Sequence, residues 1–269
     1  MPALSAEALR RDLDTQVIGR SITCLTACSS TNDHALAMAA QGAPDGAVVL
    51  AEVQLAGRGQ RGRAWLAAPG TCLLLSVLFR PKLRAPEVHL LTMLAACAGA
   101  EAVKVVTGLP CRLKWPNDLM VARRKLGGIL VEASLLGDTV EHVVAGIGLN
   151  VNLQVELYPE IAETATSLAR ELGAGVDRLA VARELLRQLD RRYLLLRRGL
   201  GKCLCGEWRG RLDTLGKRVI LVDSSGNREA VFAEDVAPDG ALLVRQADGA
   251  LRSLHVGEVS LEEMTGEGP

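Results

Sequence analysis

Glycine and arginine alternate from residue 57 to residue 63, which read GRGQRGR and follow a predicted buried strand. The glycines permit positive φ angles and a close approach of the backbone to a ligand, and the arginines bring three guanidinium groups into one loop. Such a loop can close over an anion, because N–H and guanidinium groups both bind phosphate. A solvated surface turn is the alternative, and arginine–glycine loops also occur in disordered RNA-binding segments. We favour phosphate binding, since the loop adjoins a buried strand.

A second polar block, KWPNDL, occupies residues 114–119. Proline fixes the chain there, so Asn117 and Asp118 project from a rigid turn beside Lys114. This combination suits a nucleotide–magnesium site, in which a carboxylate and waters hold the ion. Lys125 begins the sequence KLGGILVE, where its ammonium can reach a carboxylate or phosphate that lies on bare glycine backbone. Each lysine taken alone is more typical of a solvated surface charge.

Two further segments offer polar groups at the ends of predicted elements. Ser30 and Thr31 stand at the start of a predicted helix, where a hydroxyl caps the helix and the N–H groups can also bind a small polar head group. Residues 146–152, GIGLNVN, end a strand with glycines and amides, but they lack the third glycine and the downstream acid of a dinucleotide fingerprint. Hydride transfer is therefore not favoured.

The cysteines and histidines form no recognised site. The chain has seven cysteines and four histidines, and the close cysteine pairs at 24/28 and 203/205 lack the further ligands of a four-coordinate metal site. Neither an HExxH nor a GxSxG motif occurs. The sequence therefore assigns no metal-ligating residues, and it argues against a metalloprotease or a serine hydrolase.

Composition excludes further classes of protein. The 31 basic residues balance the 31 acidic ones, so no net charge draws the chain to polyanions. Three Trp, two Tyr and two Phe are too few to stack on successive bases of a single strand. The longest apolar stretches fall short of the roughly 20 residues that span a bilayer, and the first residues contain no secretory signal. We expect a cytoplasmic protein with reduced cysteines and no membrane partner.

The polar segments need a scaffold, and the apolar pattern indicates one. Short runs rich in Val, Ile and Leu predict buried strands over residues 47–53, 71–79, 128–134 and 140–147. Helical spacing predicts helices over 31–40 and 87–107, and a third from about Asp177 whose apolar stripe packs on the sheet. Beyond Arg211, short alternating segments separated by turns predict a small antiparallel β-barrel. We therefore expect two domains, 1–210 and 211–269.

In this order the motifs resemble those of biotin protein ligases. The resemblance rests on Ser30–Asn32, AEVQ at 51–54 with the glycine–arginine loop and Trp65, KWPND at 114–118, KLGGILVE at 125–132 and GIGLNVN at 146–152. It covers nearly the whole chain, and the KWPND and KLGGIL blocks are highly specific. It implies an α/β (α+β) catalytic domain like that of class II aminoacyl-tRNA synthetases, with a mixed sheet flanked by helices, and an SH3-like C-terminal β-barrel.

The resemblance also implies an AMP-forming acid–amine ligase. The biotin carboxylate attacks the α-phosphorus of ATP with Mg²⁺ present, which gives biotinyl-5′-AMP and pyrophosphate. A lysine of a biotin carboxyl carrier protein, part of acetyl-CoA carboxylase or a related carboxylase, then attacks the adenylate and releases AMP. No covalent enzyme intermediate is implied, so no cysteine or serine nucleophile is expected. A lipoate-type acyl ligase with the same adenylate chemistry is one alternative, and a binding module built on the barrel is another.

Matching positions carry the implied roles. The residues that neutralise charge during the attack, and so act in catalysis, are Arg58, Lys125 and Asp118. Contacts with biotin are implied for Ser30, Thr31, Asn32, Gln54, Gly57, Arg58, Gly59, Lys125, Gly128 and Gly146. Contacts with ATP are implied for Arg58, Gln60, Arg61, Lys114, Asn117, Asp118, Lys125 and Asn150.

The sequence departs from the family pattern at two points. The family loop commonly has a further arginine where this chain has Gln60, and that position helps to enclose the adenylate. Some members carry an N-terminal winged helix that represses biotin operons, whereas here only 28 residues precede Ser29. We therefore expect no regulation of DNA. A monomer and a homodimer both remain open.

Overall fold

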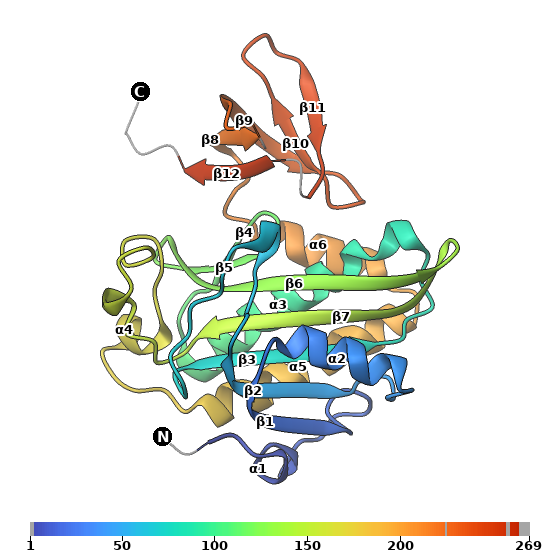
Figure 1. The fold of residues 1–269 in the computed structure, drawn as a ribbon. Coiled ribbons are helices and arrows are strands. Elements are labelled where there is room, and N and C mark those ends of the chain that lie inside the picture. The colour runs from blue at the N-terminus through green and yellow to red at the C-terminus, as the bar shows by residue number, and fades with distance from the viewer. Residues whose placement is uncertain (1–2, 224, 257–258, 264–269) are drawn as a thin grey trace.

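The computed structural model describes residues 3–223, 225–256 and 259–263 (Figure 1). Its larger part is a seven-stranded mixed sheet with the order β1-β2-β3-β7-β6-β5-β4. The strands are β1 (Ile22–Cys28), β2 (Val48–Gln54), β3 (Cys72–Phe79), β4 (Arg112–Lys114), β5 (Asp118–Val121), β6 (Arg124–Leu136) and β7 (Thr139–Asn150). Strands β1 and β2 are parallel, and the other neighbours are antiparallel. The helices are α1 (Ala6–Arg10), α2 (Thr31–Ala40), α3 (His89–Thr107), α4 (Leu168–Leu172), α5 (Arg178–Arg197) and α6 (Gly201–Arg211).

Strand β3 is buried along its whole length, so its side chains are covered on both faces of the sheet. Successive side chains of a strand point to opposite faces. Leu75 and Val77 accordingly belong to the main core, on the side of α3 and α5. Leu78 packs with α2 on the other side, and Ser76 shares that side through its hydrogen bonds to residues of α2. The alternation therefore brings one hydroxyl to the face covered by α2.

Helices cover both faces of the sheet, with α2 on one and α3, α5 and α6 on the other (Figure 1). The segment of residues 85–107, which includes α3, is long and apolar enough to cross a membrane by length and composition. Most of this segment is buried inside the protein. A helix that is apolar all round is typical of a core position. The stripe of α5 was predicted to pack on the sheet, but it packs mainly on α3, which lies between; it reaches the sheet where Tyr193 meets Phe79 with ring centroids 4.8 Å apart.

A second, smaller sheet forms the C-terminal part. Its strands, in the antiparallel order β11-β10-β9-β8-β12, are β8 (Lys217–Asp223), β9 (Arg228–Val236), β10 (Leu242–Arg245), β11 (Leu251–Leu254) and β12 (Val259–Glu263). Trp115 ties the large part to the turn before β10, because its indole N–H donates to the carbonyl of Gly240 at 2.9 Å. Its backbone N–H donates to the Thr214 hydroxyl, also at 2.9 Å. The KWPND block thus anchors the second sheet.

Most of the predicted elements are present. The predicted strands correspond to β2, β3, β6 and β7, although β6 and β7 are longer because they form one hairpin. The helices over 31–40 and 87–107 correspond to α2 and α3, with α3 starting at His89. Strands β1, β4 and β5 and helix α6 were not predicted, since their sequences are short or poor in a clear apolar period. The division at 210/211 falls at the end of α6 and stays a prediction.

Candidate active site

A cleft of about 730 Å³ lies on the α2 side of the large sheet. The start of α2, the glycine–arginine loop, the β4–β5 turn and the middle of β6 and β7 supply most of its walls. Residues 160–165 and strand β12 of the second sheet complete them. A volume of this order is typical of ligand sites, which span roughly 300–1,000 Å³. Segments that are far apart in the sequence therefore meet around one concavity.

A buried polar cluster surrounds the N-terminus of α2. Thr31 donates from its backbone N–H and from its hydroxyl to Gln54 Oε1, at 2.7 and 2.9 Å. The hydroxyl of Ser76 lies 2.7 Å from Thr31 Oγ1. Ser30 is the N-cap, and its side chain accepts from the N–H of Asn32 at 3.2 Å. A helix N-terminus with fixed hydroxyl and amide groups suits a small polar head group.

Asn32 is fixed by partners on two strands and is 3% exposed. Its amide nitrogen donates to the Leu130 carbonyl at 3.3 Å and to Glu132 Oε2 at 2.6 Å. Its Oδ1 accepts from the Ser76 hydroxyl at 2.6 Å. If the Asn32 amide were flipped, its oxygen would face the carboxylate of Glu132, which cannot donate a hydrogen bond. The two acceptors on β6 therefore determine the orientation of the amide.

Glycines leave the floor of the cleft without side chains. Gly128 pairs with Gly148 across β6 and β7, and Gly146 follows on the same face of β7. A Cβ on Gly148 would lie 2.6 Å from the indole of Trp65. A Cβ on Gly146 would lie 2.9 Å from Asn32 Cγ. Real Cβ atoms do not approach so closely, so only glycine lets these side chains lie on the backbone.

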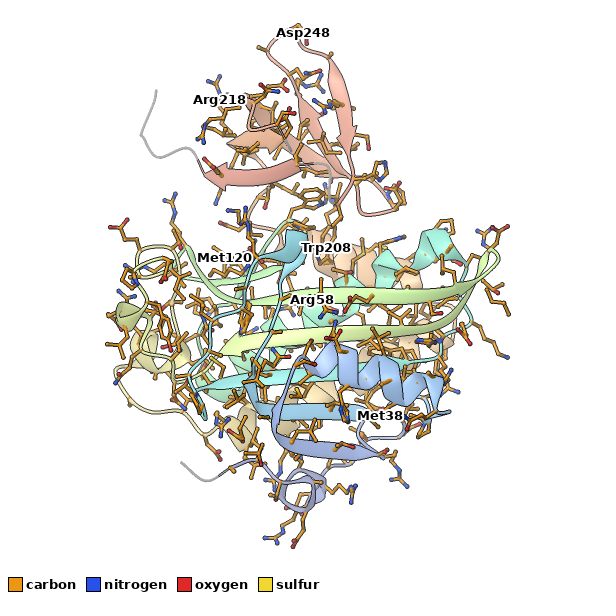
Figure 2. All side chains as sticks on the ribbon, viewed as in Figure 1. Met38, Arg58, Met120, Trp208, Arg218 and Asp248 are labelled. Atoms are coloured by element: carbon orange, nitrogen blue, oxygen red, sulfur yellow. The ribbon has the colours of Figure 1, made fainter. Side chains whose placement is uncertain are left out.

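Arg58 extends from the glycine–arginine loop over the sheet, between α2 and β6 (Figure 2). Its Nη1 and Nη2 atoms donate to the two oxygens of Asp33, at 2.9 and 2.5 Å, and Nη2 also donates to Glu132 Oε1 at 3.1 Å. The hydrogen bond from Arg58 lowers the pKa of Asp33. The carboxylates of Asp33 and then Glu132 raise the pKa of Arg58. Asp33 and Arg58 are therefore both charged at neutral pH.

Lys125 lies across the cleft floor, with its Nζ 2.6 Å from Asp118 Oδ1. Both atoms stand over Gly128, at 3.6 and 3.5 Å from the position of a Cβ there. The backbone of Lys125 is braced by Thr164 and Thr166, through bonds of 2.8 and 2.9 Å. This bracing fixes the backbone position of a lysine whose side chain, although paired with Asp118, is 41% exposed.

Two asparagines of the cleft wall donate hydrogen bonds from their side-chain amides to backbone carbonyls. Asn117 donates to the Ile129 carbonyl at 2.5 Å, and Asn150 donates to the Thr166 carbonyl at 3.0 Å. Both are buried, at 8% and 4% exposure. Their first effect is to hold the β4–β5 turn and the segment before α4 against the sheet.

The cleft contains most of the residues predicted from the sequence. Those that line it are Ser30, Thr31, Asn32, Gln54, Arg58, Gly59, Gln60, Lys114, Asn117, Asp118, Lys125, Gly128, Gly146 and Asn150. Gly57 does not line the cleft but packs behind Gln54. A Cβ at Gly57 would lie 2.8 Å from Gln54 Nε2. The side chain of Arg61 lies outside the described part of the structure. The individual contacts of these residues with ligands stay predictions.

Sequence reasoning missed three groups of residues. Residues 160–165 and strand β12 enter the wall through tertiary contacts, and no local motif marks them. Ser76 sits inside an apolar strand, where only its polarity distinguishes it. Asp33 and Glu132, the partners of Arg58, could have been found, because Asp33 follows Asn32 directly and Glu132 shares the β6 face of Gly128 by period-two spacing.

Among the described residues, four carboxylates line the cleft, those of Asp118, Glu160, Glu163 and Glu262. Among the residues that the structure describes, no three His, Cys, Asp or Glu side chains gather as a metal site. Mg²⁺ in nucleotide sites is held by one or two carboxylates together with phosphates and waters. Asp118, beside Lys125 and on the cleft wall, fits an ion that arrives with a nucleotide.

Comparisons with known proteins identify the family of the chain. A model of the Biotin/lipoate A/B protein ligase family matches residues 25–150, and a model of the Biotin protein ligase C terminal domain matches residues 214–262. A biotin--[acetyl-CoA-carboxylase] ligase of Mycobacterium tuberculosis is 36% identical over 248 residues, which cover 86% of this chain and 88% of that protein. The chain belongs to the biotin protein ligase family. The resemblance found in the motifs is thereby confirmed.

A solved structure supports the same fold. The biotin protein ligase of Aquifex aeolicus in complex with biotin and ATP matches with a TM-score of 0.78 and 27% identity, covering 91% of this chain and 99% of that one. The biotin ligase fold predicted for this chain is confirmed. The structure has a mixed sheet flanked by helices and, where an SH3-like β-barrel was predicted, a C-terminal antiparallel sheet. Bifunctional ligase/repressor BirA of Bacillus subtilis is 36% identical over 191 residues, and the chain spans 59% of its length.

Proposed function

We propose that this biotin ligase homologue joins biotin to a lysine of a biotin carboxyl carrier protein, with ATP, through biotinyl-5′-AMP. The observation that carries the proposal is the cleft itself. It combines a buried polar cluster at the start of α2, a glycine floor, and two cations from distant segments, Arg58 and Lys125. Such a cleft suits an uncharged polar head group at one end and converging anions at the other. Relatives named as biotin--[acetyl-CoA-carboxylase] ligases support biotin over lipoate.

In the first step, a carboxylate oxygen of biotin bonds to the α-phosphorus of ATP, and the bond from that phosphorus to the pyrophosphate oxygen breaks. The electron pair leaves with pyrophosphate. Negative charge therefore concentrates between two anions, and each well-placed positive donor lowers the barrier by about 3 kcal/mol. Arg58 and Lys125 supply such donors. Lys114, which lines the cleft and has no ionic partner among the described residues, supplies another for the polyphosphate.

In the second step, the lysine amine of the carrier attacks the acyl carbon of the adenylate, and AMP leaves as the amide forms. The enzyme would contribute no nucleophile. The thiol of Cys72, which lies beside Asn150 of the cleft wall, is buried, and burial raises its pKa to about 11. Mg²⁺ would be held near Asp118 by the phosphates of ATP, where it would neutralise their charge. Strand β12 borders the cleft, so a carrier lysine that enters the cleft would pass close to the second sheet.

The partner and the compartment belong to the same proposal. The carrier would be that of acetyl-CoA carboxylase or a related biotin-dependent carboxylase, since relatives of Mycobacterium tuberculosis and Paracoccus denitrificans are named for that substrate. A cytoplasmic location would follow from such a partner. The expectation that this chain does not regulate DNA stays a prediction.

The deciding experiment incubates the protein with ATP, Mg²⁺, radiolabelled biotin and a carrier domain, and then weighs the carrier by mass spectrometry. We expect the carrier to gain the mass of one biotinyl group, and pyrophosphate to appear only when biotin is present. Lipoate in place of biotin tests the lipoate-type alternative. A carrier that stays unmodified with biotin but gains a lipoyl group would refute the assignment. A protein that releases no pyrophosphate with either acid would instead favour a binding module.

A further inference from the structure

Arg58 is held by two carboxylates that do not line the cleft. Arg58 itself lines it, whereas Asp33 and Glu132 do not. The two nitrogens that meet Asp33 form a bidentate pair, which fixes the plane of the guanidinium as well as its position. Other N–H donors of Arg58 have no partner among the described residues and are available to an anion in the cleft. The carboxylates thus determine which donors Arg58 presents there.

Glu132 connects this arginine to the polar cluster at the start of α2. One of its oxygens accepts from Arg58 at 3.1 Å and the other accepts from the Asn32 amide at 2.6 Å. Glu132 lies on β6 two residues after Leu130, whose carbonyl also accepts from Asn32. A single carboxylate therefore fixes the distance between a predicted biotin contact and a predicted phosphate contact. Its side chain is 30% exposed, so solvent only partly screens these bonds.

We propose that Asp33 and Glu132 are positioning residues for the first step, in which the adenylate forms. Asp33 orients the guanidinium of Arg58, and Glu132 orients Arg58 and Asn32 together. The inference rests on the proposed function and deepens it, since neither carboxylate touches the reacting atoms. Each acts through a residue that does.

Orientation and simple charge make opposite predictions for this pair. Two carboxylates beside a site for anionic substrates repel those substrates, so by Coulomb's law their removal should strengthen anion binding. If the carboxylates instead hold the guanidinium in place, their removal lets it move out of the productive geometry. A displacement of about 1 Å can lower the rate a hundredfold. The sign of the effect therefore distinguishes the two roles.

The test uses Asp33→Asn and Glu132→Gln, which remove each charge and keep the shape. Asp33→Asn should lower kcat for biotin-dependent pyrophosphate release about tenfold and change KM for biotin far less, because only Arg58 loses its partner and the other predicted biotin contacts keep theirs. Glu132→Gln should lower kcat and also raise KM for biotin, because Asn32 loses an acceptor. In an Arg58→Ala background, Asp33→Asn should have no further effect on kcat.

Matched controls separate a positioning role from a structural one. Asp138→Asn makes the same change in the exposed β6–β7 turn and should behave as wild type. Transfer from supplied biotinyl-5′-AMP to the carrier should stay normal in Asp33→Asn, and its thermal melt verifies folding. If Asp33→Asn melts early, the kcat and KM of Glu132→Gln carry the test alone.

Two outcomes would overturn the inference while the proposed function stands. In the first, wild type is active and Asp33→Asn is equally fast or faster. In the second, Asp33→Asn slows Arg58→Ala as much as it slows wild type. A wild-type protein without biotin-dependent pyrophosphate release would refute the proposed function as well.

Discussion

Replacing Gly146 by alanine should weaken biotin binding, because the new methyl group and Asn32 need the same space. The Cβ would lie 2.9 Å from Asn32 Cγ and closer still to its Oδ1, whereas ordinary contact begins near 3.4 Å. Asn32 is buried and must move away, which breaks its bonds to Ser76 and to the charged Glu132. The charge-assisted bond alone contributes about 1.5–3 kcal/mol, so we expect biotin to bind roughly tenfold to a hundredfold more weakly.

Isothermal titration with biotin measures this loss directly. Gly206→Ala is the matched control, because a Cβ at Gly206 meets nothing within 4 Å and the residue lies inside α6. That substitution should leave biotin binding unchanged and raise the stability by up to about 1 kcal/mol, since alanine favours a helix. If Gly146→Ala binds biotin as tightly as wild type does, Asn32 has no part in the head-group site and the reasoning fails.

Three further predictions concern the loop, the ion pair and the anchor of the second sheet. Gln60→Arg adds a charge-assisted contact of about 1–2 kcal/mol, so it should slow escape of the adenylate into a chemical trap, and equal leakage would contradict this. Arg58 lowers the pKa of Asp33, so the stabilisation by this ion pair is present above the usual pKa range of aspartate and is lost as pH falls through the lowered pKa. NMR titration should show that Arg58→Ala raises the pKa of Asp33. A titration midpoint that does not move would exclude the pair. Trp115→Phe removes the 2.9 Å hydrogen bond from the indole to the Gly240 carbonyl, so it should lower the free energy of unfolding, measured by thermal denaturation, by about 1–2 kcal/mol. An unchanged melt would mean that water replaces the indole N–H.

The elements that the sequence predicted well are those with long, regular patterns. Strands β3 and β7 and helix α3 are buried over most of their length, so their apolar runs report burial directly. Strand β4 has only three residues and was missed, because a pattern that short carries no period. Strand β1 was missed although it has seven residues, since it lies at the sheet edge and its burial is partial.

The sequence by itself determined the chemistry of the site, because chemistry depends on residue types at short spacing. The loop around Arg58, the block at 114–118 and the start of β6 are local, and each indicates anion binding without any fold. Only the tertiary structure decided what those groups meet. The pairing of Arg58 with Glu132, the contribution of residues 160–165 and the approach of β12 all join segments far apart in the chain. Such contacts follow from sheet register and helix packing, which depend on the whole core rather than on any one motif.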